Sequence, residues 1–452
     1  MSQQPPTEAK VLIVGAGPSG LTTAIALLKN GIPLQDIVIV DSVLSEEHSS
    51  RAVVVHAATL EALDSLDSLG CAEELISVGI LQQRLHVQDG NGSLFVLNDF
   101  TKLQPYTKFP FACVISQAHT EMVLHKALEA LGGHVFRPLT AVGMKPVGNG
   151  LEITFESGQV ITARYVIAAD GARSVIRSIS GIKYKDPQGL EKDRSVDART
   201  SQMILADVSF QTNLDDVLPI NPYTGRFTIG PDGFFLIVPL AHPKSNSTLY
   251  GTSEPVYRIG FSIPLAKGEA PSRPGLEVLQ KFVDTQGPKF ISSDFSRNPN
   301  KPVHLKKVYW STRFRTHSAI ADTFFKRIRG ETKEENGGIV MLVGDAAHIH
   351  SPVGGQGMNL GIRDAVGLGV VVAKHIQSAD ATIDTNLQIL QDFAENRHDK
   401  ASNQIAMTKR FAWFVGSLMN PWSLQYWGVY LLARLPFLKD KLVWQLSGLG
   451  NP

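Results

Sequence analysis

Apolar runs alternate with glycine-containing turns along this chain and predict a layer of strands and helices. Val11–Val14 is a short apolar run, typical of a buried strand, and Leu21–Leu28 carries apolar residues at helical spacing. Ile37–Val40, Tyr165–Ala169 and Ile339–Val343 are further buried runs. The pattern predicts a Rossmann-like α/β layer that the chain leaves and later rejoins at Ile339–Val343.

The middle of the chain has a different pattern, which predicts an antiparallel sheet inserted into that layer. The segment from Gln202 to about Pro264 is β-rich, and Arg84–Leu97 predicts a hairpin because Asp89–Gly92 lies inside it. We expect helices at 51–69, 119–131, 275–284 and 358–376, and charged loops at 183–199 and 326–336. The predicted domains are a discontinuous cofactor domain (1–82, 110–180 and 305–375), a substrate domain (83–109 and 181–304) and a C-terminal helical segment (376–452).

The C-terminal segment is rich in Trp, Leu and Val between Phe411 and Leu449. A transmembrane helix needs about 20 nearly uninterrupted apolar residues. Pro421, Arg434, Pro436 and Lys439 interrupt every candidate, so no transmembrane span is expected. We expect this segment to form a helical flap that covers the other two domains. The alternative is that it associates with a membrane surface.

Composition narrows the functional classes. The 452 residues are 43% hydrophobic with a net charge of +1, which predicts a large core in two to three domains and no nucleic acid partner. Cys71 and Cys113 lie too far apart for a CxxC or zinc site, so no metal is expected. Free thiols and a polar start at residues 1–10, without a secretory signal, predict a cytoplasmic location.

The first candidate binding motif is the loop Gly15-Ala16-Gly17-Pro18-Ser19-Gly20, which lies between a predicted strand and helix. Gly15 allows the tight turn, Gly17 allows close approach of a pyrophosphate, and Gly20 allows close helix packing. Asp41 follows the next strand, where a carboxylate can bind ribose hydroxyls. The loop and Asp41 predict a dinucleotide with a free ribose, such as FAD or NAD.

A second loop downstream predicts that the cofactor is a flavin dinucleotide. Gly344-Asp345 ends the returning strand and places a carboxylate at the carboxyl edge of the sheet. Gly354-Gly355-Gln356-Gly357 then leads directly into the helix that begins near Met358. A helix N-terminus at this position would stabilise the negative charge of a reduced flavin ring.

With a third motif, Asp170-Gly171-Ala172-Arg173-Ser174, the chain resembles the class A flavoprotein monooxygenases, the para-hydroxybenzoate hydroxylase and phenol hydroxylase group with its fungal secondary-metabolite members. The resemblance spans essentially the whole chain. It implies non-covalent FAD, NADPH or NADH as a transient electron donor, and hydroxylation of a phenolic, polyketide or indole-type substrate by O₂ through a flavin C4a-hydroperoxide. The oligomeric expectation is a monomer or homodimer. The alternatives are an FAD-dependent epoxidase or oxidase on a non-aromatic substrate, or a non-catalytic flavin-binding redox module.

The resemblance also assigns candidate site residues. Ala58 departs from it, because an arginine is common there, so one cofactor contact would be missing or supplied by another residue. Pro239, with Phe235 and Ile237 in the same strand, is the candidate pocket wall. The candidates for assisting the reaction or holding a phenolate are Tyr223, Arg226, His56 and His350, with Pro352 packed over the flavin. The expected cofactor contacts are Gly15, Gly17, Pro18, Ser19, Gly20, Asp41, Arg51, Gln117, Asp170, Arg173, Asp345, Pro352, Gly354, Gly355, Gly357, Met358 and Asn359.

Overall fold

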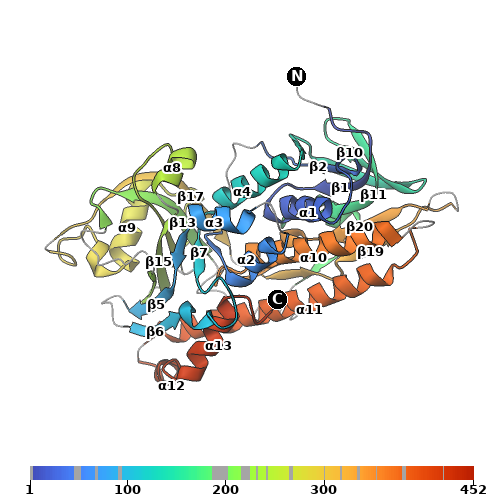
Figure 1. Ribbon diagram of the computed structural model, residues 1–452. Helices are drawn as coiled ribbons and strands as arrows, with labels where there is room; N and C mark the ends of the chain where they lie inside the picture. The colour runs from blue at the N-terminus through green and yellow to red at the C-terminus, as the bar shows by residue number, and fades with distance from the viewer. Residues whose placement is uncertain are drawn as a thin grey trace.

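Two large sheets and a helical C-terminal region make up the molecule (Figure 1). The computed structural model describes residues 4–44, 52–66, 70–89, 94–185, 202–214, 224–230, 233–240, 243–263, 268–299, 301–315, 318–332, 336–352, 354–378, 383–420 and 422–451. One sheet combines parallel and antiparallel strands with helices packed on it, and the other is mostly antiparallel. The predicted fold class is confirmed.

The first sheet has a parallel core that the chain builds from distant segments. Its central strands follow the order β20, β11, β1, β2 and β8, and the apolar residues of β1, β11 and β20 are buried because both faces of this core are covered. The core strands are β1 (Glu8–Val14), β2 (Ile37–Val40), β8 (Val135–Phe136), β11 (Val160–Ala168) and β20 (Gly338–Leu342). Antiparallel strands β9 (Ala141–Val147), β10 (Gly150–Phe155) and β19 (Phe325–Ile328) flank the core. The return of the chain at β20 makes this layer discontinuous, as the sequence predicts.

Helices α1 (Pro18–Lys29) and α10 (Gly357–Ser378) pack closely beside this sheet. A Cβ at Gly369 of α10 would lie 2.4 Å from the Cβ of Ala26 in α1, so glycine permits the two backbones to approach. The remaining helices of this half are α2 (Ala57–Asp64), α3 (Cys71–Val78), α4 (Gln117–Ala130) and α5 (Val175–Ile179).

The second sheet runs β17, β13, β16, β15, β14, β5 and β6. Its strands are β5 (Arg84–Asp89), β6 (Leu94–Asp99), β13 (Gln202–Phe210), β14 (Thr224–Gly230), β15 (Gly233–Leu240), β16 (Val256–Ile263) and β17 (Leu305–Arg315). The predicted hairpin is present as β5 and β6, and it joins this sheet through a parallel pairing of β5 with β14. Helix α9 (Leu276–Gln286) packs on one face through Leu279 and Val283. The other face is turned towards the first half of the molecule.

Three helices form the C-terminal region: α11 (Gln388–Ser417), α12 (Leu424–Leu432) and α13 (Pro436–Leu446). Val415 and Val429 share a core with Phe95 and Phe234 of the second sheet, while α11 also packs against α10. Within the described residues, no helix is long and apolar enough to cross a bilayer. The expected helical segment therefore packs against both halves of the chain.

Some expected elements are wrong. The helix expected from residue 51 begins only at Ala57, because the β-branched Val54 and Val55 form strand β3 (Val54–Val55), paired with β7 (Ala112–Val114). The loop expected from Lys326 begins instead as β19, and helix α8 (Pro243–Tyr250) interrupts the β-rich region. The shorter elements are β4 (Ile80–Gln82), β12 (Tyr184–Lys185), β18 (Ala319–Ala321), β21 (His348–Ile349), η1 (Leu34–Asp36), η2 (Phe100–Leu103), η4 (Lys289–Ile291) and η5 (Gly344–Ala346).

Candidate active site

The first glycine loop has the geometry of a phosphate site. Gly15 has φ +105°, and a Cβ there would lie 2.2 Å from the carbonyl oxygen of Ala169, so only glycine fits. A Cβ at Gly17, in contrast, would meet nothing within 4 Å, and no side chain caps the N-terminus of α1. Pro18 occupies the first turn of α1, where its missing N–H is not needed. The open loop and the uncapped helix end together offer N–H donors to an anion.

Asp41 lies beside this loop at the end of β2. Its carboxylate accepts hydrogen bonds from the backbone N–H groups of Ala16 (2.6 Å) and Val43 (2.8 Å). Gln117 and Glu121 lie on α4, and the Gln117 amide donates to the Glu121 carboxylate (2.8 Å). Burial, with a contribution from the charge of Asp41, raises the pKa of Glu121 to about 7. These polar groups lie together beside the first glycine loop, and their role at the ribose of a dinucleotide stays a prediction.

Arg51 lies outside the described residues, but its neighbour Ala52 is held firmly. The Ala52 N–H donates to the Gln117 side-chain oxygen (3.3 Å), and the Ala52 carbonyl accepts from the Gln117 N–H (2.9 Å). Arg258 of the second sheet also donates to this carbonyl (3.1 Å). The predicted contact residue Gln117 therefore positions the segment that leads from Arg51.

Asp170 has a structural task at the Asp-Gly motif. One carboxylate oxygen accepts from the N–H groups of Val175 (2.8 Å) and Ile176 (3.1 Å) and so caps α5. The other oxygen is buried, with no hydrogen-bond partner among the described residues, and burial raises the pKa of Asp170. The predicted contact Arg173 is exposed.

Arg177, which the sequence analysis does not single out, joins two of the motifs. It is buried and donates to the carbonyl oxygens of Ala172 (3.0 Å) and Ala346 (3.0 Å). Its guanidinium lies 3.8 Å from the ring centre of Tyr184, whose hydroxyl donates to the carbonyl of Asp345 (3.0 Å). The Asp-Gly and Gly-Asp loops are thereby fixed to each other.

The Gly-Asp loop meets both α1 and α10. Gly344 has φ +62°, and a Cβ there would lie 2.4 Å from the Ser19 hydroxyl oxygen. A Cβ at Gly361 of α10 would lie 2.6 Å from the same oxygen. The absence of side chains at these two glycines brings Ser19 and the exposed Asp345 to one edge of the parallel sheet.

The loop before α10 is shaped by two glycines in left-handed conformation. Gly354 has φ +88° and Gly355 has φ +65°, and a Cβ on Gly355 would lie 2.4 Å from the Val54 Cγ1. Asn359 accepts from the His56 N–H (2.8 Å) and donates to the carbonyls of Val54 (2.9 Å) and Gly355 (2.6 Å). Asn359, predicted as a cofactor contact, uses these hydrogen bonds to hold the loop in place.

The remaining predicted contacts of this segment are close by. Pro352 accepts the Gly355 N–H through its carbonyl (2.9 Å), which closes a turn before α10. Gly357 is the first residue of α10, and Met358 packs against the main core. The helix therefore begins directly at the glycine loop, as the sequence predicts.

The buried His56 and the half-buried His350 flank the loop in neutral form. His56 Nε2 lies 2.9 Å from the Gly354 carbonyl and His350 Nδ1 lies 3.2 Å from the Ser351 carbonyl, so both nitrogens must donate. The other ring nitrogens, His56 Nδ1 and His350 Nε2, are buried acceptors with no hydrogen-bond partner among the described residues. Burial lowers the pKa of each imidazole to about 4. Each histidine thus presents a lone pair at neutral pH.

A buried ionic cluster ties α10 to α11. His348 lies 2.7 Å from one oxygen of Asp364, and Arg397 of α11 donates to the other (2.5 Å). Although burial raises the pKa of Asp364, Arg397 and His348 outweigh it and the net shift is downward. Arg363 donates to the Gly448 carbonyl (3.1 Å) near the end of the chain. The sequence signal for this cluster is the charged pair Arg363-Asp364, which stands between the apolar residues of the first half of α10.

The substrate-sheet candidates are placed differently from the prediction. Tyr223 lies outside the described residues. Arg226 pairs across the sheet with Ile237, whose side chain is in the core beneath α9. Because alternate residues of a strand point to opposite faces, Arg226, Phe235 and Ile237 lie away from the glycine loops.

The side chains of the second sheet that do face the cofactor half are Leu236 and Val238. They form an apolar cluster with Val53, Ile80 and Val114. The expected wall is therefore wrong by one residue in register, because the sequence does not reveal which face of β15 the α9 helix covers. These two side chains therefore pack against Val53 and against strands β4 and β7.

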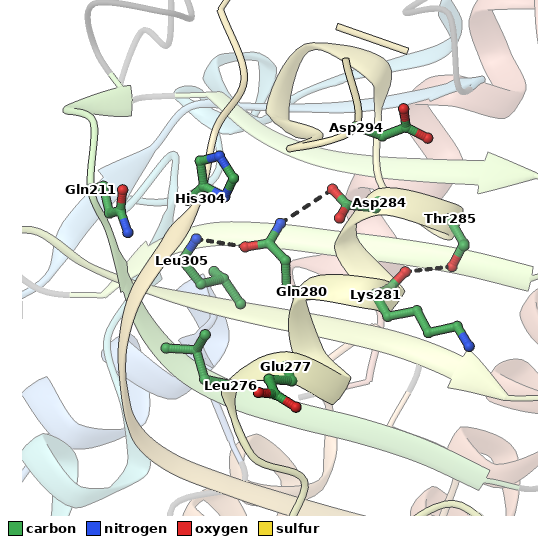
Figure 2. A pocket seen from close by; sticks show the side chains of 10 residues that line it. All are labelled: Gln211, Leu276, Glu277, Gln280, Lys281, Asp284, Thr285, Asp294, His304 and Leu305. Carbon is green, nitrogen blue, oxygen red and sulfur yellow. Dashed lines mark hydrogen bonds between the residues drawn. The ribbon is translucent and has the colours of Figure 1, made fainter. Parts of the chain in front are cut away.

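A cavity of about 460 Å³ lies elsewhere, between α9 and β17 (Figure 2). Gln280 donates to Asp284 (3.2 Å) and accepts from the Leu305 N–H (2.7 Å), so these polar groups are already paired. The cavity is on the face of the second sheet that is turned away from the glycine loops, so it is not part of this site.

The family described as FAD binding domain matches residues 8–248 and 304–401. Pentachlorophenol 4-monooxygenase of Sphingobium chlorophenolicum is 28% identical over 373 residues, which cover 81% of this chain and 58% of that protein. Rifampicin monooxygenase of Streptomyces venezuelae is 26% identical over 368 residues, covering 81% of this chain and 64% of the relative. This chain thus spans less than two thirds of the length of either relative.

Solved structures share the fold over nearly the whole chain. p-Nitrophenol 4-monooxygenase from Pseudomonas putida covers 99% of both chains with a TM-score of 0.71 at 19% identity. The ternary complex of aklavinone-11 hydroxylase with FAD and aklavinone covers 88% of this chain and 67% of that chain, with a TM-score of 0.64 at 18% identity. At these identities the likeness establishes the fold.

Proposed function

This chain belongs to the FAD binding domain family, and we propose that it is an NAD(P)H-dependent monooxygenase that hydroxylates an aromatic small molecule with O₂. The observation that carries the proposal is the meeting of three glycine-containing loops at one edge of a parallel sheet, those of Gly15, Asp170-Gly171 and Gly344. The names of the relatives, which are monooxygenases of phenols and polyketide antibiotics, support this substrate class and a role in secondary metabolism.

The residues present fit FAD. The open Gly17 and the uncapped start of α1 suit the pyrophosphate, and Asp41 suits the adenosine ribose. The exposed Asp345 carboxylate would accept a hydrogen bond from a ribityl hydroxyl, and the left-handed Gly354 and Gly355 would present backbone to the flavin, since a Cβ on Gly355 would meet Val54. FAD is held without a covalent bond in this proposal.

The protein's own groups would govern the reaction around the bound cofactor. FAD would supply hydride acceptance from NADPH or NADH and activation of O₂. The N-terminus of α10, at Gly357, would stabilise negative charge on the near edge of the flavin. Leu236 and Val238 would exclude water from the reacting atoms, and Pro352 would pack over the ring.

A phenolic substrate needs a group that can bind its hydroxyl. His56 Nδ1 and His350 Nε2 are buried lone pairs beside the loop, and both imidazoles are neutral at pH 7 because burial lowers the pKa of each to about 4. A conjugate acid this strong does not keep a phenolic proton, so we propose that one of them accepts a hydrogen bond from the phenolic hydroxyl and holds it in place. Arg226 is not favoured for this role, since it lies on the α9 face of the sheet.

We further propose that the enzyme is cytoplasmic, that it is a monomer or a homodimer, and that it can contact a membrane peripherally. Cys71 and Cys113 are both free and buried, as suits a reducing compartment. Burial raises the pKa of Cys113 to about 12, so its thiol stays protonated and unreactive.

The test is NADPH and NADH oxidation by purified holoprotein against a panel of phenols, indoles and polyketide aromatics. Stimulation by an aromatic compound, with a hydroxylated product, is the expected result. Turnover only of a non-aromatic olefin or alcohol would replace the proposal with an epoxidase or oxidase, and bound FAD without any turnover would replace it with a redox module.

A further inference from the structure

The C-terminal helices leave an apolar face uncovered. Val429 of α12 is buried against the second sheet, but Leu424, Trp427 and Leu431, at helical spacing on the same helix, are 92%, 53% and 64% exposed. The helix contains no charged residue. A helix that is apolar on all sides is ordinarily buried in a core or in lipid.

The apolar surface continues beyond the helix. Trp422 just before α12 is 96% exposed and Phe437 at the start of α13 is 65% exposed. We define the α12 face as Trp422, Leu424, Trp427, Leu431, Leu432 and Phe437. Figure 1 shows α12 at the lower edge of the molecule, so neighbouring elements leave it accessible. An exposed apolar surface of this kind marks an interaction site.

The charged residues near the α12 face indicate which kind of partner it can bind. Residues 401–451 contain five lysines and arginines (Lys409, Arg410, Arg434, Lys439 and Lys441) and a single acidic residue, Asp440, although the whole chain has 43 basic and 42 acidic residues. Asp440 is itself paired with Lys102 (2.6 Å). The guanidinium of Arg434 lies 4.1 Å from the ring centre of Tyr430, which holds one cation beside α12. In α12, α13 and the segment between them, basic residues therefore outnumber acidic ones by three to one, although Asp89 of β5 lies near Tyr426 of α12.

An apolar face with basic residues beside it favours a lipid surface as its partner over a second copy of the chain. A symmetric dimer through the α12 face would bring two positive surfaces together, which opposes association. Anionic headgroups would instead attract the cations while the apolar side chains enter the bilayer boundary. Two exposed tryptophans are also typical of residues at the membrane–water interface.

We propose that the α12 face docks on the surface of an anionic phospholipid bilayer, with α12 lying in the plane of the interface. The nine residues of α12 are far fewer than the roughly 20 that would cross a membrane, so docking is peripheral. The proposal goes beyond the reaction and does not depend on it, because binding is measured without substrate.

The experiment is co-sedimentation of the full-length, FAD-loaded protein with vesicles of phosphatidylcholine alone or with 30% phosphatidylserine. Binding is expected only with phosphatidylserine and should weaken as salt rises. Lys439→Gln with Lys441→Gln should weaken it about thirtyfold, since each basic residue near an anionic surface contributes roughly one factor of five. Trp427→Gln with Leu431→Gln should weaken it at least tenfold.

Phe295→Gln is the matched control, because Phe295 is 69% exposed and follows Asp294, which lines the cavity beside α9, whereas α12 packs in a different cluster of the second sheet. It should bind vesicles like the parent protein. Bound FAD and the thermal midpoint, measured for every variant, separate loss of docking from loss of folding. Absence of binding to either vesicle, equal binding to both, or a solution dimer that Trp427→Gln dissolves would overturn the proposal.

Discussion

Asp207→Asn should strongly destabilise the protein, because it would leave a buried arginine without its counter-charge. Arg258 and Asp207 are fully buried in the second sheet and form two hydrogen bonds, of 2.6 and 2.8 Å. Tyr250 donates to the same carboxylate (2.9 Å). Removing one partner of a buried ion pair costs about 3 to 5 kcal/mol, whereas removing both is often neutral. The double variant Asp207→Asn/Arg258→Met should therefore recover most of the lost stability.

The assay is urea unfolding followed by tryptophan fluorescence, with FAD affinity measured in parallel. Trp310 reports locally, since the Arg258 guanidinium lies 5.0 Å from its ring centre. FAD affinity should remain weakened in the double variant even where stability recovers, because Arg258→Met removes the hydrogen bond that Arg258 donates to the Ala52 carbonyl. Glu254→Gln is the control: it breaks an exposed pair with Lys306 and should cost less than about 1 kcal/mol. Equal losses of stability in the single and double variants would refute the reasoning.

Three further predictions concern the cofactor site. Asp345→Ala should weaken FAD binding roughly tenfold to a hundredfold, by loss of a charge-assisted hydrogen bond, and far more than Asp170→Ala does; an unchanged dissociation constant would remove Asp345 from the site. Pro352→Gly should raise hydrogen peroxide released per NADPH while FAD content stays near normal, and unchanged coupling would place Pro352 elsewhere. His56 has a folded pKa of about 4 against 6.5 in the unfolded chain, so the unfolded state takes up its proton first and stability falls as pH drops from 6.5 towards 4. Urea unfolding of the apoprotein between pH 7 and pH 4.5 should show this fall diminished by His56→Gln, and an identical fall in both proteins would contradict the neutral buried histidine.

The sequence predicts the parts of this structure that depend on local pattern. The strand, glycine loop and helix from Val11 to Leu28 are present, and so is the return of the chain to the first sheet at β20. In these segments the spacing of apolar residues and the positions of the glycines indicate the same strand, turn and helix, so few alternative conformations compete with them. The domain boundaries remain predictions.

What the sequence does not reveal is set by tertiary contacts. The face of β15 that meets the cofactor half depends on where α9 packs, and this reverses the expected roles of Ile237 and Val238. Arg177 and Asn359 act on backbone carbonyls of loops distant in sequence, which no spacing rule reports. Local hydrogen bonds also add a structural task, since Asp170, a candidate cofactor contact by the resemblance, caps α5 with one carboxylate oxygen.

The incorporation of labelled oxygen tests the proposed monooxygenase reaction most directly. Holoprotein, NADPH and a stimulating aromatic substrate are incubated under ¹⁸O₂ in ordinary water, and the product is analysed by mass spectrometry. A monooxygenase should place one ¹⁸O atom in the hydroxylated product for each NADPH consumed in coupled turnover. Product oxygen derived from water, or NADPH oxidation that yields only hydrogen peroxide with every aromatic that stimulates it, would contradict a monooxygenase.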